Sequence, residues 1–327
     1  MTYKDRIYGE VEILESVILD LINSKSLQRL KGIDQAGYFK PYFPNSGYNR
    51  FEHSLGVFII LKKYGAPLEE QIAGLIHDVS HSAFSHCIDY TLDSGSHTEQ
   101  NHQDNIFEEF VRKSDIPAIL KNYNLNLDYI LDDKNFSLKE KDLPDLCADR
   151  IDYSLREIVN YGKSDNIYTD SILDNLVIRN NSWIFKDLKI AKKYAEFFRI
   201  MNNEFWAGEI SALMFITVGS YLKYALQQKY ISEDDLYTTD KEIIDKINIF
   251  LDKDEKLKLF WDRMNNKISF NFDRKDYDYS VFCKSRIVDP LCIYSGNVLR
   301  VSDIDKNWKD VVKEELKPKE YYIKFER

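Results

Sequence analysis

Hydrophobic residues recur along this chain mainly at helical spacing, and the pattern predicts a mostly α-helical fold. The clearest stretch lies early, where residues 53–64 predict one helix and Pro67 opens a second. Within that second helix, residues 72–79 place four apolar side chains at i, i+3, i+4 and i+7, a stripe that faces a core. If the helix continues, His77 and His81 project from neighbouring turns of one face.

Helical periodicity extends through most of the chain and is interrupted by polar loops. Loops are predicted at residues 32–47, which hold several glycines and prolines, and at residues 91–100. A charged stretch at residues 131–141 is expected on the surface. Further helices are predicted at residues 17–22, 26–30, 106–111, 119–120, 129–131, 146–159, 191–207 and 209–228, with a helix-start signal at 239–242.

Apolar and polar residues alternate near both ends of the chain, which is typical of strands. Residues 4–13 predict a short strand or a hairpin arm. We therefore predict a helical core over residues 1–240 and a small α+β appendage over residues 241–327. The strands of the appendage are predicted at residues 268–272, 279–287 and 321–325.

Composition excludes several classes of protein. A hydrophobic content of 44% over 327 residues is ample for a packed core. The net charge of −9 argues against a general nucleic-acid binder, which usually has a basic surface, so we expect no stable nucleic-acid binding. No apolar signal region opens the chain, no apolar run is long enough to cross a bilayer, and the four cysteines form no CxxC pair. We expect a soluble, cytoplasmic protein with reduced thiols and no membrane partner.

Candidate chemistry is concentrated in one block that contains every histidine of the chain. Imidazole is the commonest protein ligand for metals and titrates near neutral pH. Because Asp78 and Asp89 are interleaved with these histidines, the block predicts a metal-centred active site. The alternative is a chance grouping of core and surface histidines. The histidines are His53, His77, His81, His86, His97 and His102.

Three side chains of this block and one from a later helix form a candidate ligand set on three predicted helices: His53, His77, Asp78 and Asp149. A mixed nitrogen and oxygen shell leaves positions open for water and substrate, as a catalytic site requires. It suits Mn, Fe, Co, Ni or Zn better than Ca, and Mg is also possible. Such an ion acidifies bound water and polarises a phosphoryl oxygen, so the set predicts phosphate-ester hydrolysis.

Proton transfer and phosphate binding are predicted for side chains around this set. We expect His81 and His102 to donate protons or to stabilise charge on a phosphate, with His97 as the alternative to His102. Asp89 is expected to orient one of them, and His86 to be structural or to assist from beside the site.

Two arginines and one helix face are candidates for substrate contacts. Arg50 has the planar fork that clamps phosphate, although a surface ion pair is the alternative. Asp149, Tyr153 and Glu157 are spaced i, i+4, i+8, so they line one face of a helix, with Arg150 and Arg156 flanking it. That face lies either in solvent or along a cleft.

The ligand set resembles that of the HD-domain phosphohydrolase superfamily, whose hallmark is a separated H…HD…D pattern. Residues 49–57 and 74–86 are similar to the deoxynucleoside triphosphate triphosphohydrolase branch, which includes the sterile-alpha-motif HD-domain protein. Shorter similar segments occur at residues 27–30, together with Gln35, and at residues 149–153 and 286–290.

The resemblance implies a mostly helical HD-domain bundle, a divalent metal ion and a nucleotide pocket beside it. It implies catalytic roles for His81, His102 and Asp89. The implied reaction hydrolyses a deoxynucleoside triphosphate (dNTP) to deoxynucleoside and triphosphate, through attack of metal-bound hydroxide on the α-phosphorus. Members of the family commonly form dimers or higher homo-oligomers, and we expect the same here.

The resemblance also implies which residues contact the nucleotide. Arg50, Arg150 and Tyr153 match its phosphate and sugar contacts. Gln35 matches a residue that reads the 3′ side of the sugar, and Glu157 is a substrate contact where the family has an aspartate.

The stretch Asn203–Glu209 favours a second hypothesis. It is acidic and aromatic where the triphosphohydrolases carry basic residues that face the triphosphate tail. This difference favours a nucleoside monophosphate, a cyclic nucleotide or another phosphoester as substrate. A third hypothesis is a non-catalytic nucleotide-binding protein, against which the complete ligand set weighs.

Overall fold

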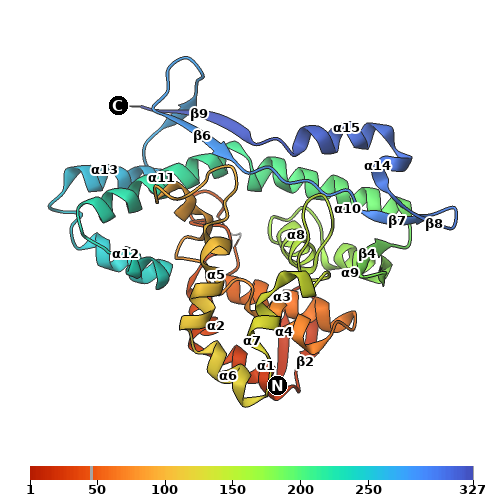
Figure 1. The fold of residues 1–327 in the computed structure, drawn as a ribbon. Coiled ribbons are helices and arrows are strands. Elements are labelled where there is room, and N and C mark those ends of the chain that lie inside the picture. The colour runs from red at the N-terminus through yellow and green to blue at the C-terminus, as the bar shows by residue number, and fades with distance from the viewer. Residues whose placement is uncertain (45–46, 327) are drawn as a thin grey trace.

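The computed structural model describes residues 1–44 and 47–326 and confirms a mostly helical fold with small sheets (Figure 1). Residues 45 and 46, inside the predicted loop 32–47, and residue 327 lie outside the described part. Up to residue 175 the elements are β1 (Thr2–Asp5), β2 (Gly9–Glu12), α1 (Ser16–Ile22), α2 (Lys25–Arg29), η1 (Leu30–Gly32), α3 (Arg50–Lys63), α4 (Leu68–Ile76), η2 (Ser85–Tyr90), α5 (His102–Lys113), α6 (Ile116–Asn122), α7 (Leu127–Leu131), η3 (Asp133–Asn135), α8 (Ala148–Asn160) and α9 (Asn166–Asn175).

The second half of the chain contains two long helices followed by smaller elements. In Figure 1, α10 and α11 run one after the other across the molecule, with the C-terminal strands β6 and β9 beside them. The elements are β3 (Leu176–Arg179), β4 (Ser182–Phe185), α10 (Leu188–Met201), the π-helical turn η4 (Asn202–Trp206), α11 (Glu209–Gln227), η5 (Asp234–Tyr237), α12 (Asp240–Asn248), α13 (Glu255–Met264), β5 (Phe270–Phe272), β6 (Tyr279–Cys283), β7 (Leu291–Tyr294), β8 (Asn297–Arg300), α14 (Val301–Ile304), α15 (Lys306–Glu315) and β9 (Lys319–Phe325).

Helices α3 and α4 form where the hydrophobic pattern predicts them. The side chain of Asn49 accepts a hydrogen bond from the amide of Glu52 and so caps the start of α3. Pro67 stands before α4, where its missing amide hydrogen is harmless. Helix α4 ends at Ile76, so His77 caps it and the chain turns before His81. The two histidines therefore do not share a helix face, because His81 lies beyond the turn that follows α4.

Helix α8 carries the predicted polar face on its pocket side. It begins at Ala148, two residues later than predicted, and Cys147 precedes it as the cap. Its opposite side is apolar, and Ile151 and Leu155 are fully buried. Burial of this apolar stripe fixes the rotation of the helix and turns the polar stripe, which includes Tyr153, toward the pocket.

The charged stretch at residues 131–141 is only partly on the surface. Phe136 and Leu138 are buried, and the side chain of Lys139 is also buried. The surface prediction is wrong for these three residues, because two apolar side chains pull the segment against the core while its charged neighbours face the pocket.

The sheets match the predicted strands and add others. Strands β1 and β2 form the predicted N-terminal hairpin, and β5, β9 and β6 form an antiparallel sheet at the three predicted C-terminal strands, although β6 ends at Cys283 and not at the predicted residue 287. The four-stranded sheet β3-β4-β7-β8 was not predicted. In it β4 pairs in parallel with β7, so backbone pairing crosses residue 240. The division into a core and an appendage at this residue stays a prediction.

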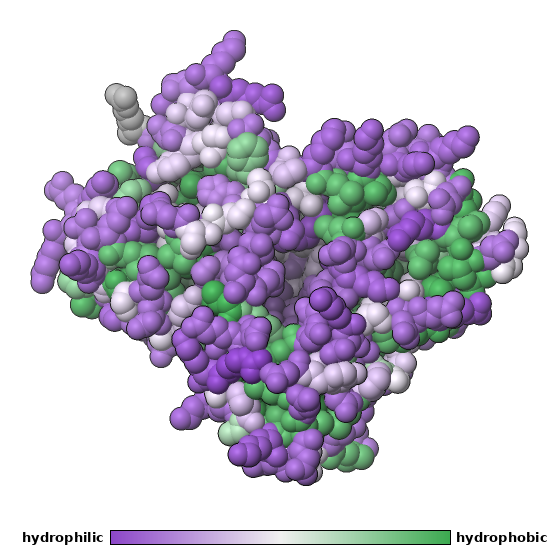
Figure 2. Space-filling model, in the orientation of Figure 1, coloured by the Kyte–Doolittle hydropathy of each residue, from purple (hydrophilic) through white to green (hydrophobic). Residues whose placement is uncertain are grey.

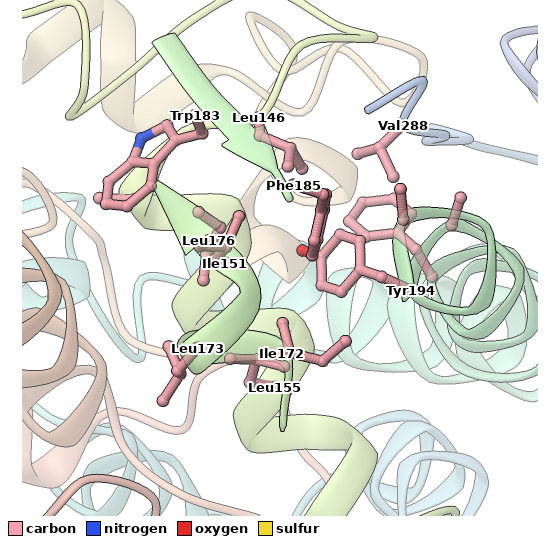
Figure 3. Close-up of a cluster of buried hydrophobic side chains, with 14 of the residues drawn as sticks. Leu146, Ile151, Leu155, Ile172, Leu173, Leu176, Trp183, Phe185, Tyr194 and Val288 are labelled. Carbon is pink, nitrogen blue, oxygen red and sulfur yellow. The ribbon is translucent and has the colours of Figure 1, made fainter. Parts of the chain in front are cut away.

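One hydrophobic cluster joins α8 to segments far along the chain (Figure 3). Ile151 and Leu155 of α8 pack in it with side chains of β4 and α10. Val288, from the connection between β6 and β7, belongs to the same cluster and is fully buried. The cluster therefore anchors that connection beside α8.

No single helix among the described residues is long and apolar enough to cross a membrane. One bent pair, Leu188–Trp206 with Glu209–Gln227, passes by length and composition alone.

Candidate metal centre and substrate pocket

A pocket of about 500 Å³ opens between α8 and the elements around α5. Figure 2 shows this face to be largely hydrophilic and hollowed near its centre, between the positions that Figure 1 labels α5 and α8. Side chains from α3, α8, η4 and the connection between β6 and β7 line it. The predicted site residues along its wall are Gln35, Arg50, His77, Asp78, His81, Asp149, Arg150, Tyr153 and Glu157.

The four predicted ligands converge on one point of the pocket wall. His53 Nε2 lies 2.9 Å from Asp149 Oδ1 and 3.2 Å from His77 Nε2. Ligand atoms of His53, His77 and Asp149 lie within 4.8 Å of one another, and Asp78 stands beside them, with Oδ1 3.4 Å from His77 Nε2 and Oδ2 3.8 Å from His53 Nε2. Helix α3, the end of α4 and the first turn of α8 each supply part of the set. Three segments distant in sequence therefore form one cluster, as the motif predicts.

The hydrogen bonds of the two histidines test whether this cluster fits a cation. His77 Nδ1 donates to the carbonyl oxygen of Gly74 at 2.7 Å, and His53 Nδ1 lies 2.7 Å from a carboxylate oxygen of Asp152. Both partners accept only, so in each neutral ring Nε2 presents its lone pair. Two such lone pairs face each other at 3.2 Å beside Asp149. A cluster of acceptors repels itself unless positive charge lies among them, and a divalent ion fits.

The pKa values of the cluster reflect the same demand for positive charge. Burial opposes charge on His53, but hydrogen bonds to Asp149 and Asp152 outweigh it and raise the pKa of His53 to about 10. Burial also opposes charge on His77, and the neighbouring Asp78 raises the pKa of that ring. The carboxyl of Asp78 is buried, yet the Arg50 guanidinium holds its pKa well below the usual range.

A buried network links His53 to the N-terminal hairpin. Asp152 accepts from Arg156 Nη2 at 2.8 Å and from the hydroxyl of Tyr8 at 2.7 Å. Arg156 Nη2 also donates to Asp5 Oδ2 at 3.1 Å. Because Asp152 fixes which ring nitrogen of His53 carries the proton, this network orients a candidate metal ligand. Asp152, Asp5 and Tyr8 were missed by sequence reasoning and Arg156 was expected only to flank the polar face of the helix, since the contacts of Asp5 and Tyr8 with this helix join residues far apart in the chain.

Helices α3 and α8 approach closely at this network, and Gly56 makes the approach possible. A Cβ at Gly56 would lie 1.9 Å from Asp152 Oδ1 and 2.3 Å from Arg156 Nη2. Any larger residue there would displace the carboxylate that holds His53.

Arg50 is engaged by the protein itself. It is almost fully buried, and its guanidinium donates to Asp78 Oδ2 at 2.6 Å, to Ser85 Oγ at 2.8 Å and to the carbonyl oxygen of Gln35 at 2.5 Å. These bonds orient the carboxylate of Asp78 toward the cluster. Contact between Arg50 and a phosphate stays a prediction.

His81 and His86 place two neutral imidazoles in the pocket wall. Burial and the charge of Arg50 lower the pKa of His81 to about 3, and the same two causes lower the pKa of His86 well below its usual value. His81 Nε2 lies 3.2 Å from Asp78 Oδ1. The Nδ1 atom of each ring is buried without a hydrogen-bond partner among the described residues. Both residues line the pocket.

The side chains of Asp89 and His102 lie outside the pocket lining. Asp89 Oδ1 accepts from the amide of His102 at 3.3 Å, while its Oδ2 lies 4.0 Å from His86 Nδ1. Burial raises the pKa of Asp89 to about 6. His102 Nε2 is 2.9 Å from the hydroxyl of Tyr237, and His97 stacks on Tyr90 with ring centroids 4.1 Å apart. The catalytic roles of Asp89 and His102 stay predictions.

Three predicted substrate contacts share the pocket wall. Gln35 is buried and its Oε1 makes no hydrogen bond within the described part of the chain. Tyr153 lies against the ring of Trp206, with centroids 5.0 Å apart. Glu157 accepts from the hydroxyl of Tyr48 at 2.9 Å and from the indole of Trp206. Burial outweighs these bonds and raises the pKa of Glu157 to about 7.

The guanidinium of Arg150 lies against a second group of potential metal-ligand atoms. Atoms of Glu140, Cys147 and Asp149 lie within 4.8 Å of one another. Arg150 Nη1 lies 3.0 Å from Cys147 Sγ, and Nη2 lies 3.2 Å from Glu140 Oε1. The guanidinium supplies the positive charge that these atoms require, so this group does not call for a metal ion.

Four other charged residues of the pocket were also missed by sequence reasoning. Asp104 follows the N-terminus of α5, and Lys139 stands in the stretch expected on the surface. Lys284 and Arg286 come from the connection between β6 and β7. Of these four residues, only Arg286 could have been found from the sequence, because it opens one of the segments that resemble the family.

Comparison with protein families matches an HD-domain model to residues 50–156. The uncharacterized protein YdhJ of Bacillus subtilis is 32% identical over 309 residues, which are 94% of this chain and 93% of that protein. The metal-dependent phosphohydrolase cns2 of Cordyceps militaris is 37% identical over 49% of this chain and 46% of its own length. The deoxynucleoside triphosphate triphosphohydrolase SAMHD1 of Mus musculus is 32% identical over 38% of this chain and 22% of its own length.

Solved structures share the fold across the whole chain. A hypothetical protein from Aquifex aeolicus superimposes with a TM-score of 0.76, at 19% identity, over 99% of this chain and 96% of its own. A phosphohydrolase from Bacteroides thetaiotaomicron superimposes with a TM-score of 0.73, at 16% identity, over the full length of both chains.

Proposed function

We propose, since the chain belongs to the HD-domain phosphohydrolase superfamily, that it is a divalent-metal-dependent phosphohydrolase that acts on nucleotides. One observation carries the proposal. Two imidazole nitrogens and the carboxylate of Asp149 point their lone pairs at one place beside the pocket, and the carboxylate of Asp78 lies next to them. Phosphate-ester hydrolysis is the reaction that such a mixed ligand set serves in this superfamily.

The chain's own residues have distinct tasks in this proposal. His53, His77, Asp78 and Asp149 would hold the ion, which when bound acidifies water and polarises a phosphoryl oxygen. His81 is neutral, and because its Nε2 donates to Asp78, its unpartnered Nδ1 is an acceptor, which suits the proton of a hydroxyl group or of a water molecule at the site.

The substrate that fits best is a dNTP, cleaved to deoxynucleoside and triphosphate. The unpartnered Oε1 of Gln35 and the carboxyl of Glu157 suit sugar hydroxyls, and the rings of Phe205 and Trp206 suit a base. Arg150 contributes positive charge beside the ligand set. The partial similarity to SAMHD1, named a deoxynucleoside triphosphate triphosphohydrolase, supports this choice. A cytoplasmic location and homo-oligomers stay predictions.

A product assay tests the proposed reaction. The purified protein is incubated with Mn²⁺ or Mg²⁺ and each dNTP in turn, and nucleoside and triphosphate are separated by ion-exchange chromatography. We expect both products in equal amounts, and their loss in Asp149→Asn. Absence of both products with every nucleotide and either metal refutes the dNTP assignment.

A second candidate keeps the centre and changes the substrate to a nucleoside monophosphate, a cyclic nucleotide or another phosphoester. The observation that favours it is the stretch Asn203–Glu209, which brings Phe205 and Trp206 but no cation to the pocket. Glu204 instead pairs with Lys163. Screening the same protein on phosphomonoesters and cyclic nucleotides separates the two candidates, because only the second predicts turnover of compounds with one phosphate.

A further inference from the structure

Two basic side chains in the pocket have no acidic partner. Lys284 and Arg286 stand in the connection between β6 and β7, and both line the pocket. The ammonium of Lys284 makes no ion pair or hydrogen bond within residues 1–44 and 47–326. Arg286 donates only to neutral acceptors, from Nη1 to the carbonyl oxygen of Lys284 at 3.2 Å and from Nη2 to Gln100 Oε1 at 3.1 Å. Their positive charges are thus left for a ligand.

The backbone that carries these two residues is held firmly. Asn202, which is fully buried in η4, accepts from the amide of Arg286 at 2.8 Å and donates to Ser285 Oγ at 2.9 Å. Ile287 and Val288, next along the chain, are fully buried in the cluster of Figure 3. A binding group fixed in advance loses little entropy when its ligand arrives.

The groups around Lys284 leave its positive charge only partly balanced, although the carboxylates of Asp104 and Glu99 attract it. Burial and then repulsion from Arg286 lower the pKa of Lys284. Asp104 attracts this ammonium but forms no ion pair with it in the described structure. Arg150 adds further repulsion, and its own charge is already matched by Glu140. Two adjacent cations that form no ion pair in the described structure are typical of a phosphate-binding wall.

We propose that Lys284 and Arg286 form an anion subsite that binds a phosphate group of the substrate other than the one at the metal centre. The inference rests on the proposed function, because it takes the scissile phosphate to lie at the ligand set. It assigns the substrate to nucleoside di- or triphosphates. It also explains how this chain manages without basic residues in Asn203–Glu209: the cations come from a different segment, which η4 holds in place through Asn202.

Binding of inorganic triphosphate tests the subsite without requiring turnover. Calorimetric titrations at a fixed free Mg²⁺ concentration compare the wild type with Lys284→Gln and Arg286→Gln. Each variant removes one charge and keeps a long polar side chain. We expect wild-type binding that weakens with salt, and about tenfold weaker binding in each variant. Lys275→Gln is the matched control, because it removes a charge from an exposed position on the same part of the chain.

The outcomes separate this inference from the proposed function. If triphosphate binds the wild type and Lys275→Gln alike but the pocket variants about tenfold more weakly, the subsite stands even when no nucleotide is hydrolysed. If dNTPs are hydrolysed while both pocket variants bind triphosphate like the wild type, the subsite is wrong and the function stands. Failure of the wild type to bind triphosphate also overturns the subsite. Thermal unfolding is measured for each variant to show that the variant is folded.

Discussion

Replacement of Asp152 with asparagine tests how the protein orients its candidate metal ligand His53. The carboxylate accepts from His53 Nδ1 at 2.7 Å on one oxygen and from the hydroxyl of Tyr8 at 2.7 Å on the other, while Arg156 donates to both. Asparagine offers one acceptor and one donor. If its oxygen serves Tyr8, its amide group faces His53 Nδ1, which must then accept. The proton of the ring moves to Nε2, where the ion is expected to bind.

This geometry gives the expected size of two losses, one in metal affinity and one in unfolding free energy. Loss of a partner that orients a ligating histidine typically costs about 10–100-fold in metal affinity, which is about 1.4–2.7 kcal/mol. The buried charge-assisted hydrogen bonds of the carboxylate are each worth about 1.5–3 kcal/mol of unfolding free energy. Arg156 retains Asp5 as a partner, so the variant should be destabilised but folded.

The matched control is Tyr8→Phe, which removes one donor but leaves the carboxylate and the tautomer of His53 intact. Metal affinity is measured by competition with a chelating dye, and unfolding free energy by urea denaturation of the metal-free proteins. We expect Asp152→Asn to lose both affinity and stability, and Tyr8→Phe to lose stability alone. Equal metal affinity in Asp152→Asn and the wild type would refute the reasoning.

Further predictions concern the metal ligands, the core and pH. His77→Ala and Asp78→Ala should each lose bound metal and turnover while circular dichroism stays native; retention of full activity by either would mean that the site is misplaced. Leu155→Ala should lower the unfolding free energy by about 2–5 kcal/mol in urea, because its side chain is fully buried in the cluster of Figure 3; a cost near zero would contradict that packing. Burial and then the nearby Asp34 raise the pKa of Asp240 from 3.8 to about 8. The free energy of unfolding that depends on this carboxyl is therefore highest below about pH 4, and it is lost as the pH rises through 8. Asp240→Asn should flatten this fall in urea titrations between pH 5 and 8.5, and an unchanged slope would contradict the assignment.

The sequence by itself determined the local elements and the chemistry available to them. The apolar stripe at residues 72–79 and the cap before Glu52 specify α4 and α3, because helical hydrogen bonds and caps join residues at most four apart. Strand alternation likewise specified β5, β6 and β9. The histidine and aspartate types in the motif determined which cations the chain could bind.

Only the tertiary structure decided which side chains meet. It brought Asp149 to 2.9 Å from His53, bound Arg50 to Asp78, and set Lys284 and Arg286 in the pocket wall. It also ended α4 before His81 could share a face with His77. These contacts join residues far apart in the chain, and their energies depend on burial and on neighbouring charges. No local pattern records either, because both arise only when the helices pack together.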